Sequence, residues 1–168
     1  SNLTSTNGAT VTLYAQWTPI KCTVTFNGNG GTAHESKTVD YGKQIKDIPQ
    51  SKRTGYTFDG WYTEKTNGTK LTTSTSITSN ITYYARWTPC SYTISFNGNG
   101  STAGSTASMS CKYGSSYTLT ANGFARTGYT FNGWSMYKDG SGTSYYDKKT
   151  VSNLTSTNGA TVTLYAQW

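Results

Sequence analysis

The chain has 168 residues and a formal charge of +7, yet only 12% of its residues are charged and 14% are aromatic. Because its Lys and Arg residues are spread out and form no basic helix or nucleic-acid motif, the charge favours weak attraction to anionic polymers and argues against nucleic-acid recognition. No apolar run approaches the length of a membrane span, so we expect no membrane insertion.

The chain opens with a segment that returns at its far end. Residues 1–17 read SNLTSTNGATVTLYAQW, letter for letter the sequence of residues 152–168. From Val11 to Trp17, apolar and polar residues alternate with the period of a strand that has one buried face. We therefore expect residues 1–17 to be the closing strand of a preceding repeat. Such an orphan strand would be disordered, dock locally, or replace the closing strand of a neighbouring molecule in a head-to-tail strand exchange.

Two Thr-Pro pairs, Thr18-Pro19 and Thr88-Pro89, each lead directly into a predicted strand. Proline fixes its own backbone angle and biases the preceding residue toward an extended form, so these junctions should be short and stiff. The segments 22–26 and 92–96 alternate and end in an Asn-Gly-Asn-Gly turn sequence, which predicts a hairpin that returns toward a later Tyr-Gly pair.

Two of the three cysteines lie in the second predicted hairpin. If that hairpin is centred near Gly100, Cys90 and Cys111 are equidistant from its turn and face each other across the strands. We predict a cross-strand disulfide, or at least a contact, which requires that the two Cα atoms lie within about 7 Å. Cys22 has no partner in this pattern and is predicted to be buried and reduced.

The segments 43–52 and 115–125 are the only places where the sequence could form a helix. Pro49 limits the first segment and Asn122-Gly123 limits the second. We expect one short helix or an irregular turn in each.

The most strongly repeated stretch comes next. RTGYTFDGW at residues 53–61 returns as RTGYTFNGW at residues 126–134, with one change in nine residues. The glycine before the tryptophan should permit a β-bulge or a close backbone approach. Closing strands at 81–87 and 162–168 then repeat the alternation of the leading segment. The framework residues are Gly55, Tyr56, Phe58, Gly60, Trp61, Trp87, Gly128, Tyr129, Phe131, Gly133, Trp134 and Trp168.

The order of these landmarks makes the chain a tandem repeat. Phe-Asn-Gly-Asn-Gly, Tyr-Gly, the nine-residue stretch and Tyr-Ala-x-Trp occur twice in the same sequence. We predict three parts: the closing strand of a preceding repeat at 1–17, one repeat at 18–87 and a second at 88–168.

These four landmarks resemble the Listeria-Bacteroides repeat, the internalin B-type B-repeat of bacterial surface proteins. The resemblance covers both repeats and the leading segment. It implies an α+β, mostly β fold class, namely tandem small β-grasp domains, ubiquitin- or SUMO-like, each with a mixed sheet and at most one short helix. It also implies arrays in large secreted or wall-anchored extracellular proteins, acting as stalks or in adhesion, and no catalytic residues.

The residues themselves indicate no reactive site. A single histidine, His34, lies in a predicted turn and has no counterpart in the second repeat, and no carboxylate is clearly shared between repeats. General acid–base chemistry needs paired, perturbed groups, so we expect no enzyme, no metal and no cofactor. The favoured function is a semi-rigid spacer whose partners are the neighbouring repeats of the same chain.

A binding module is the alternative. Tyrosines and one arginine near the closing strands could form an aromatic platform for a cell-wall polymer, a glycan or a host surface protein, unless they pack beneath a covering helix. The candidate platform residues are Tyr62, Tyr84, Arg86, Tyr137, Tyr145, Tyr146 and Tyr165.

Overall fold

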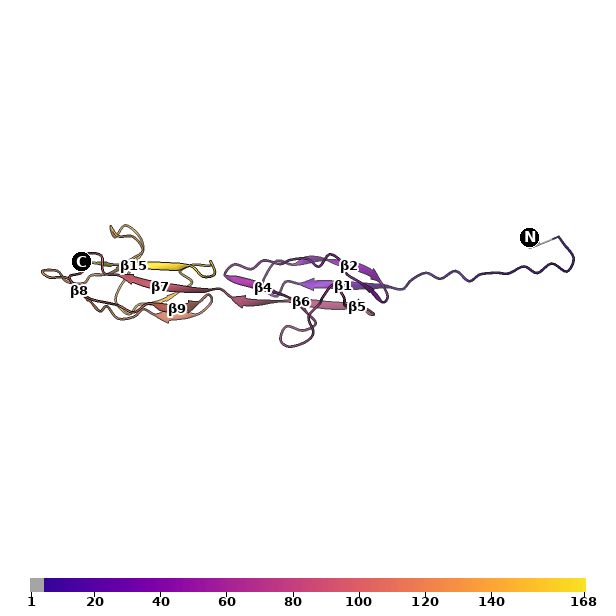
Figure 1. Cartoon of the computed structure of the whole chain (residues 1–168), viewed down its shortest axis with the longest axis horizontal. Helices are drawn as coiled ribbons and strands as arrows, with labels where there is room; N and C mark the ends of the chain where they lie inside the picture. The colour runs from indigo at the N-terminus through magenta and orange to yellow at the C-terminus, as the bar shows by residue number, and fades with distance from the viewer. Residues whose placement is uncertain (1–4) are drawn as a thin grey trace.

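A computed structural model describes residues 5–168 of the chain. Figure 1 shows two β-structured bodies that lie end to end, with the leading segment running away from the first and the C-terminus at the opposite end. The described residues contain strands and turns and no helix. The mostly-β expectation is therefore confirmed, whereas the α component of the predicted α+β class is not found.

The first repeat forms a mixed four-stranded sheet in the order β2-β1-β6-β4. Its strands are β1 (Lys21–Asn27), β2 (His34–Asp40), β4 (Tyr56–Tyr62) and β6 (Ile81–Pro89). β1 and β6 are parallel neighbours at the centre, and the outer pairs are antiparallel. The mixed sheet and the hairpin after β1 agree with the sequence-based expectation.

The second repeat repeats this arrangement with one added edge strand, in the order β13-β12-β15-β7-β9. β7 and β15 are the parallel central pair. The strands are β7 (Ser91–Asn97), β9 (Met109–Lys112), β12 (Gly133–Ser135), β13 (Ser144–Tyr145) and β15 (Thr161–Gln167). A small separate ladder pairs β8 (Ala103–Gly104) with β11 (Phe124–Ala125).

Short strand ladders occupy the two segments where the sequence predicts a short helix or an irregular turn. β3 (Lys43–Gln44) pairs with β5 (Ser76–Ile77), and β10 (Ser116–Thr118) pairs with β14 (Thr150–Ser152). Backbone groups that a helix would satisfy internally bond instead to the loop before the closing strand. Proline or glycine soon follows in each segment, so a helix would be too short to compete.

Aromatic rings form the centre of each repeat, and the two cores share no residue. In the first repeat Trp61 packs edge-on against Phe26 and Phe58, with ring centroids 4.9 and 5.4 Å apart, and Phe58 also contacts Trp87 at 5.3 Å. These large side chains bury enough area to build a core in a small repeat of low apolar content. The same contacts in the second repeat are Phe96–Trp134 at 4.8 Å, Phe131–Trp134 at 4.9 Å and Phe131–Trp168 at 5.7 Å.

The Asn-Gly-Asn-Gly turn is fastened to the closing strand by two side chains. Asn29 adopts a positive φ of 45° and donates from Nδ2 to the Ala85 carbonyl at 3.0 Å. Trp87 donates from Nε1 to the Gly28 carbonyl at 3.1 Å. The second repeat makes the same two bonds, from Asn99 to Ala166 at 2.8 Å and from Trp168 to Gly98 at 2.9 Å.

The glycine before each central tryptophan has a positive φ, 133° at Gly60 and 120° at Gly133. In β4 the register shifts between Phe58 and Gly60, so the predicted bulge is confirmed there. This bulge aims Trp61 into the core from a strand that would otherwise turn it toward the other face.

The leading segment differs from its twin. Residues 152–168 include β15, whereas residues 5–17 have no strand partner among the described residues, and Trp17 is 88% exposed. The strand predicted from Val11 to Trp17 is therefore not formed. β15 is held between β7 and β12, and in the first repeat the corresponding place beside β1 is filled by β6. Residues 1–4 of this segment lie outside the described part.

The disulfide prediction is wrong in this structure, because Cys90 and Cys111 are both free. The strand register explains the difference. Cys111 is paired with Tyr92, and the residue that bonds to the Cys90 carbonyl is Tyr113, at 2.8 Å. The hairpin is thus centred one residue later than assumed, which moves each cysteine two positions out of register. Burial raises the pKa of the Cys111 thiol, so this side chain stays protonated. Cys22 is buried and free, as expected.

Candidate functional site

The junction between the repeats is continuous strand structure. β6 runs past the predicted boundary after Trp87 to Pro89, and β7 begins at Ser91, so Cys90 alone separates the two strands. β4 follows the same path, since Thr57 pairs with Thr88 and Tyr56 with Pro89. A linker that is itself part of a ladder has few ways to bend.

Cys90 is tied to both repeats through its backbone. Its N–H donates to the Gly55 carbonyl of the first repeat at 2.9 Å, and its carbonyl accepts from the Tyr113 N–H of the second repeat at 2.8 Å. The side chain is buried, at 5% exposure. The single residue between the two strands, Cys90, is therefore hydrogen-bonded to both repeats.

Two Tyr–Gly contacts complete the junction. The rings of Tyr56 and Tyr113 meet edge to face, with centroids 5.8 Å apart. A Cβ at Gly55 would lie 2.2 Å from the Tyr113 ring, and one at Gly114 would lie 2.6 Å from the Tyr56 hydroxyl, so glycine is needed on each side. We call these four residues and Cys90 the junction cluster. The guanidinium of Arg53 lies 3.9 Å from the Tyr56 ring centre and packs against that ring.

The predicted tyrosine platform of the first repeat is a half-buried surface covered by cations. Tyr62 and Tyr84 are cross-strand partners on β4 and β6. The Arg86 guanidinium lies 4.1 Å from the Tyr62 ring centre, and amino groups approach the same rings, Lys70 at 5.9 Å from Tyr62 and Lys65 at 5.8 Å from Tyr84. The ring faces are thus partly occupied by positive charge, which makes this a cationic surface rather than a bare aromatic one.

The platform tyrosines of the second repeat do not share one environment. Tyr145 is buried and is the cross-strand partner of Trp134. Tyr137 and Tyr146 are exposed. Lysine amino groups lie over three of the rings: Lys138 is 5.8 Å from the Tyr165 ring centre, and Lys149 is 5.3 Å from that of Tyr146 and 5.7 Å from that of Tyr145. The seven predicted residues therefore belong to separate surfaces on the two repeats.

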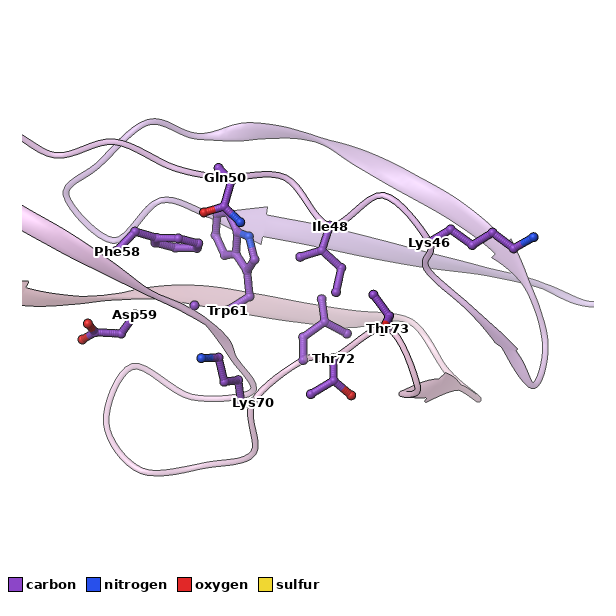
Figure 2. A pocket seen from close by; sticks show the side chains of 11 residues that line it. Lys46, Ile48, Gln50, Phe58, Asp59, Trp61, Lys70, Thr72 and Thr73 are labelled. Atoms are coloured by element: carbon purple, nitrogen blue, oxygen red, sulfur yellow. The ribbon is translucent and has the colours of Figure 1, made fainter.

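An open pocket of about 530 Å³ lies beside the core tryptophan of the first repeat (Figure 2). Trp61 forms its inner wall and donates from Nε1 to the Pro49 carbonyl at 2.6 Å. Lys46 and Lys70 line it, and its one carboxylate, Asp59, accepts a hydrogen bond from Thr88 at 2.9 Å. With a single carboxylate engaged elsewhere, the pocket can hold a polar or anionic group but has no acid–base pair.

His34 is not the solvated turn residue that the sequence indicated. It begins β2, is half-buried, and lies edge-on to Trp61 with centroids 5.7 Å apart. It therefore serves the aromatic core. Within residues 5–168, no group of three His, Cys, Asp or Glu side chains converges as metal ligands would.

Two segments, residues 23–86 and 92–167, match the Listeria-Bacteroides repeat domain. The chain belongs to the Listeria-Bacteroides repeat family. Each matched segment covers most of one mixed sheet and of one aromatic core, so the family's repeat unit and the folded unit nearly coincide. The short helix and the β-grasp topology suggested by the resemblance do not follow from this match.

Relatives of this Listeria-Bacteroides repeat chain are much longer proteins. A protein of Evansella cellulosilytica whose name assigns it to the membrane is 32% identical over 98% of the chain and 25% of its own length. A second from that organism, named as Gly-rich, is 34% identical over 94% of the chain and 17% of its own length. Internalin H of Listeria monocytogenes is 36% identical over 54% of the chain and 18% of its own length. No solved structure matches. The described residues include no helix long and apolar enough to cross a membrane.

Proposed function

We propose that this chain is a non-catalytic, semi-rigid spacer within a large bacterial cell-surface or secreted protein, where such repeats form a stalk or contribute to adhesion. Family membership and the similarity to an internalin support the extracellular setting. The observation that carries the proposal is the junction, where one residue joins two strands and is hydrogen-bonded on both sides. A spacer transmits orientation only when its joints are stiff.

The test is the distribution of distances between the two repeats. Spin labels are attached at Ser36→Cys in β2 and Ser110→Cys in β9, both exposed positions, and the unaltered chain controls for labelling of the buried native cysteines. We expect a narrow distribution. A flexible Gly-Ser insertion between Pro89 and Cys90 should at least double its width. A parent distribution as wide as that of the insertion variant would reject the spacer proposal.

A binding module is the second candidate, supported by the cationic surface around Tyr62 and by the pocket beside Trp61. The ligand class that fits is an anionic polymer such as an acidic cell-wall glycan, because lysine and arginine dominate both places. Binding of a purified anionic wall polymer should weaken several-fold in Arg86→Gln and remain unchanged in Lys52→Gln, an exposed cation elsewhere. Equal loss in both variants would mean that only the overall charge matters.

A further inference from the structure

The outer ends of the two repeats carry the residues that meet inside the junction cluster, except that Ile20 stands where the junction has Cys90. At the junction the first repeat supplies Gly55 and Tyr56, and the second supplies Cys90, Tyr113 and Gly114. The residues equivalent to Gly55 and Tyr56 are Gly128 and Tyr129, at the far end of the second repeat. The residues equivalent to Cys90, Tyr113 and Gly114 lie at the near end of the first repeat. Each free end is therefore one half of a joint already seen complete.

The far end of the second repeat, which we call the tail surface, consists of Arg126, Gly128 and Tyr129. Its local structure is already formed, because the guanidinium of Arg126 lies 3.9 Å from the Tyr129 ring centre, the same distance as at the junction. Unlike Gly55 and Tyr56 at the junction, these residues are not covered by another repeat. Tyr129 is 55% exposed, and a Cβ at Gly128 would meet nothing within 4 Å.

The near end of the first repeat, which we call the head surface, consists of Ile20, Tyr41 and Gly42. The Tyr41 N–H donates to the Ile20 carbonyl at 2.8 Å, as Tyr113 does to Cys90. Ile20 is nevertheless 71% exposed and Tyr41 is 57% exposed, whereas Cys90 is buried. A Cβ at Gly42 also meets nothing within 4 Å.

We propose that the tail surface of this chain is a docking site for the head surface of another Listeria-Bacteroides repeat, with this chain's own first repeat as an example of the partner. This inference rests on the spacer proposal and extends it. In the docked pair the Ile20 N–H donates to the Gly128 carbonyl, Tyr41 stacks edge-on against Tyr129, and each ring lies over the opposing glycine. Ile20 takes the place that Cys90 has at the junction, so its exposed apolar side chain becomes buried.

The small size of the two surfaces determines whether docking occurs between separate chains or between repeats of one chain. A junction of five residues is far smaller than the interfaces that hold separate chains together, which bury roughly 1,200–2,000 Å². Two separate chains should therefore associate weakly. A repeat that follows Trp168 through its own Thr-Pro pair is held next to the tail surface at high effective concentration, so the same contacts suffice. The joint is thus expected to form between successive repeats of one chain.

The test is the full chain extended by a third repeat. Residues 18–87 are appended after Trp168, so that Trp168-Thr-Pro reproduces the order Trp87-Thr88-Pro89, and a second version appends residues 88–168. Distances are measured between labels in repeats one and two and, separately, in repeats two and three. We expect both distributions to be narrow and alike. Tyr129→Ser should widen the second distribution at least twofold and leave the first unchanged.

The outcomes separate the two proposals. A wide distribution between repeats two and three in both versions, beside a narrow one between repeats one and two, would overturn the docking surface and leave the spacer proposal standing. A wide distribution in both places would reject the spacer proposal as well. No effect of Tyr129→Ser on a narrow second distribution would show that the Thr-Pro strand alone sets the angle, and would also overturn the docking surface.

Discussion

At the residue scale, the two repeats provide natural matched pairs. Trp61 and Trp134 occupy the same place against the same aromatic neighbours, and both are fully buried. Their indole nitrogens differ. Trp61 Nε1 donates to the Pro49 carbonyl, whereas Trp134 Nε1 is buried without a hydrogen-bond partner in the described residues. An unsatisfied buried donor costs about 1–3 kcal/mol, so the second repeat forgoes stability that the first retains.

This difference predicts unequal costs for the same substitution. Trp61→Phe removes packing and a hydrogen bond, whereas Trp134→Phe removes packing and an unsatisfied donor. We expect Trp61→Phe to destabilise its repeat by about 1 kcal/mol more than Trp134→Phe does. Hydrogen exchange of amides in β6 and β15 reports the opening free energy of each repeat separately. A larger loss for Trp134→Phe would contradict the prediction.

At the element scale, periodicity predicted the strands well and register poorly. The alternation of the closing strands correctly placed Tyr83, Ala85 and Leu164 in the core, because a strand has only two faces. The pairing of Cys90 with Cys111 failed because register depends on how many residues the turn consumes. The side chains and positive φ angles around Asn99 fix that number, and counting from the turn centre does not reveal it.

The candidate site was also only partly predictable from sequence. The Tyr-Gly pair and the Gly-Tyr pair of the nine-residue stretch are both repeated landmarks, but the sequence does not show that Gly55-Tyr56 of one repeat meets Tyr113-Gly114 of the next. The one available clue was that glycine stands beside tyrosine in both landmarks. Likewise, the cations over Tyr62 and Tyr84 come from β6, which carries Arg86, and from the segment after β4, which carries Lys65 and Lys70. Lys138 over Tyr165 repeats the contact of Lys65 with Tyr84, but sequence spacing alone does not show that either lysine lies over a ring.

The leading segment carries a prediction of its own. We propose that residues 10–16 can replace β15 of a second molecule, because the two sequences are identical and would make the same contacts. The resident strand has the advantage of being tethered, at an effective concentration on the order of mM. We therefore expect a monomer at micromolar concentration and head-to-tail oligomers only near millimolar concentration. Light scattering of the chain with and without residues 1–17 checks this, and oligomers that persist after the deletion would refute it.

At the scale of the whole molecule, the question is whether the two repeats keep a fixed relative orientation or move independently. Their cores are separate, so rigidity depends on the junction, that is, on the junction cluster and on the strand that leads from β6 to β7. Gly55 and Gly128 allow that dependence to be isolated. They have nearly the same backbone, with φ angles of 76° and 79°, but only Gly55 faces a ring from the other repeat.

Alanine at these two glycines should therefore have different consequences. Either substitution forces a side chain into a left-handed conformation, at a cost of about 1–2 kcal/mol to its own repeat. In Gly55→Ala the new methyl group also collides with the Tyr113 ring, so the junction must open, while Gly128→Ala leaves it closed. We expect equal local destabilisation by hydrogen exchange but a widened inter-repeat distance only in Gly55→Ala. If both variants kept a narrow distance, the Tyr–Gly contacts would not be what holds the repeats in line, and the continuous strand from β6 to β7 would have to account for the stiffness.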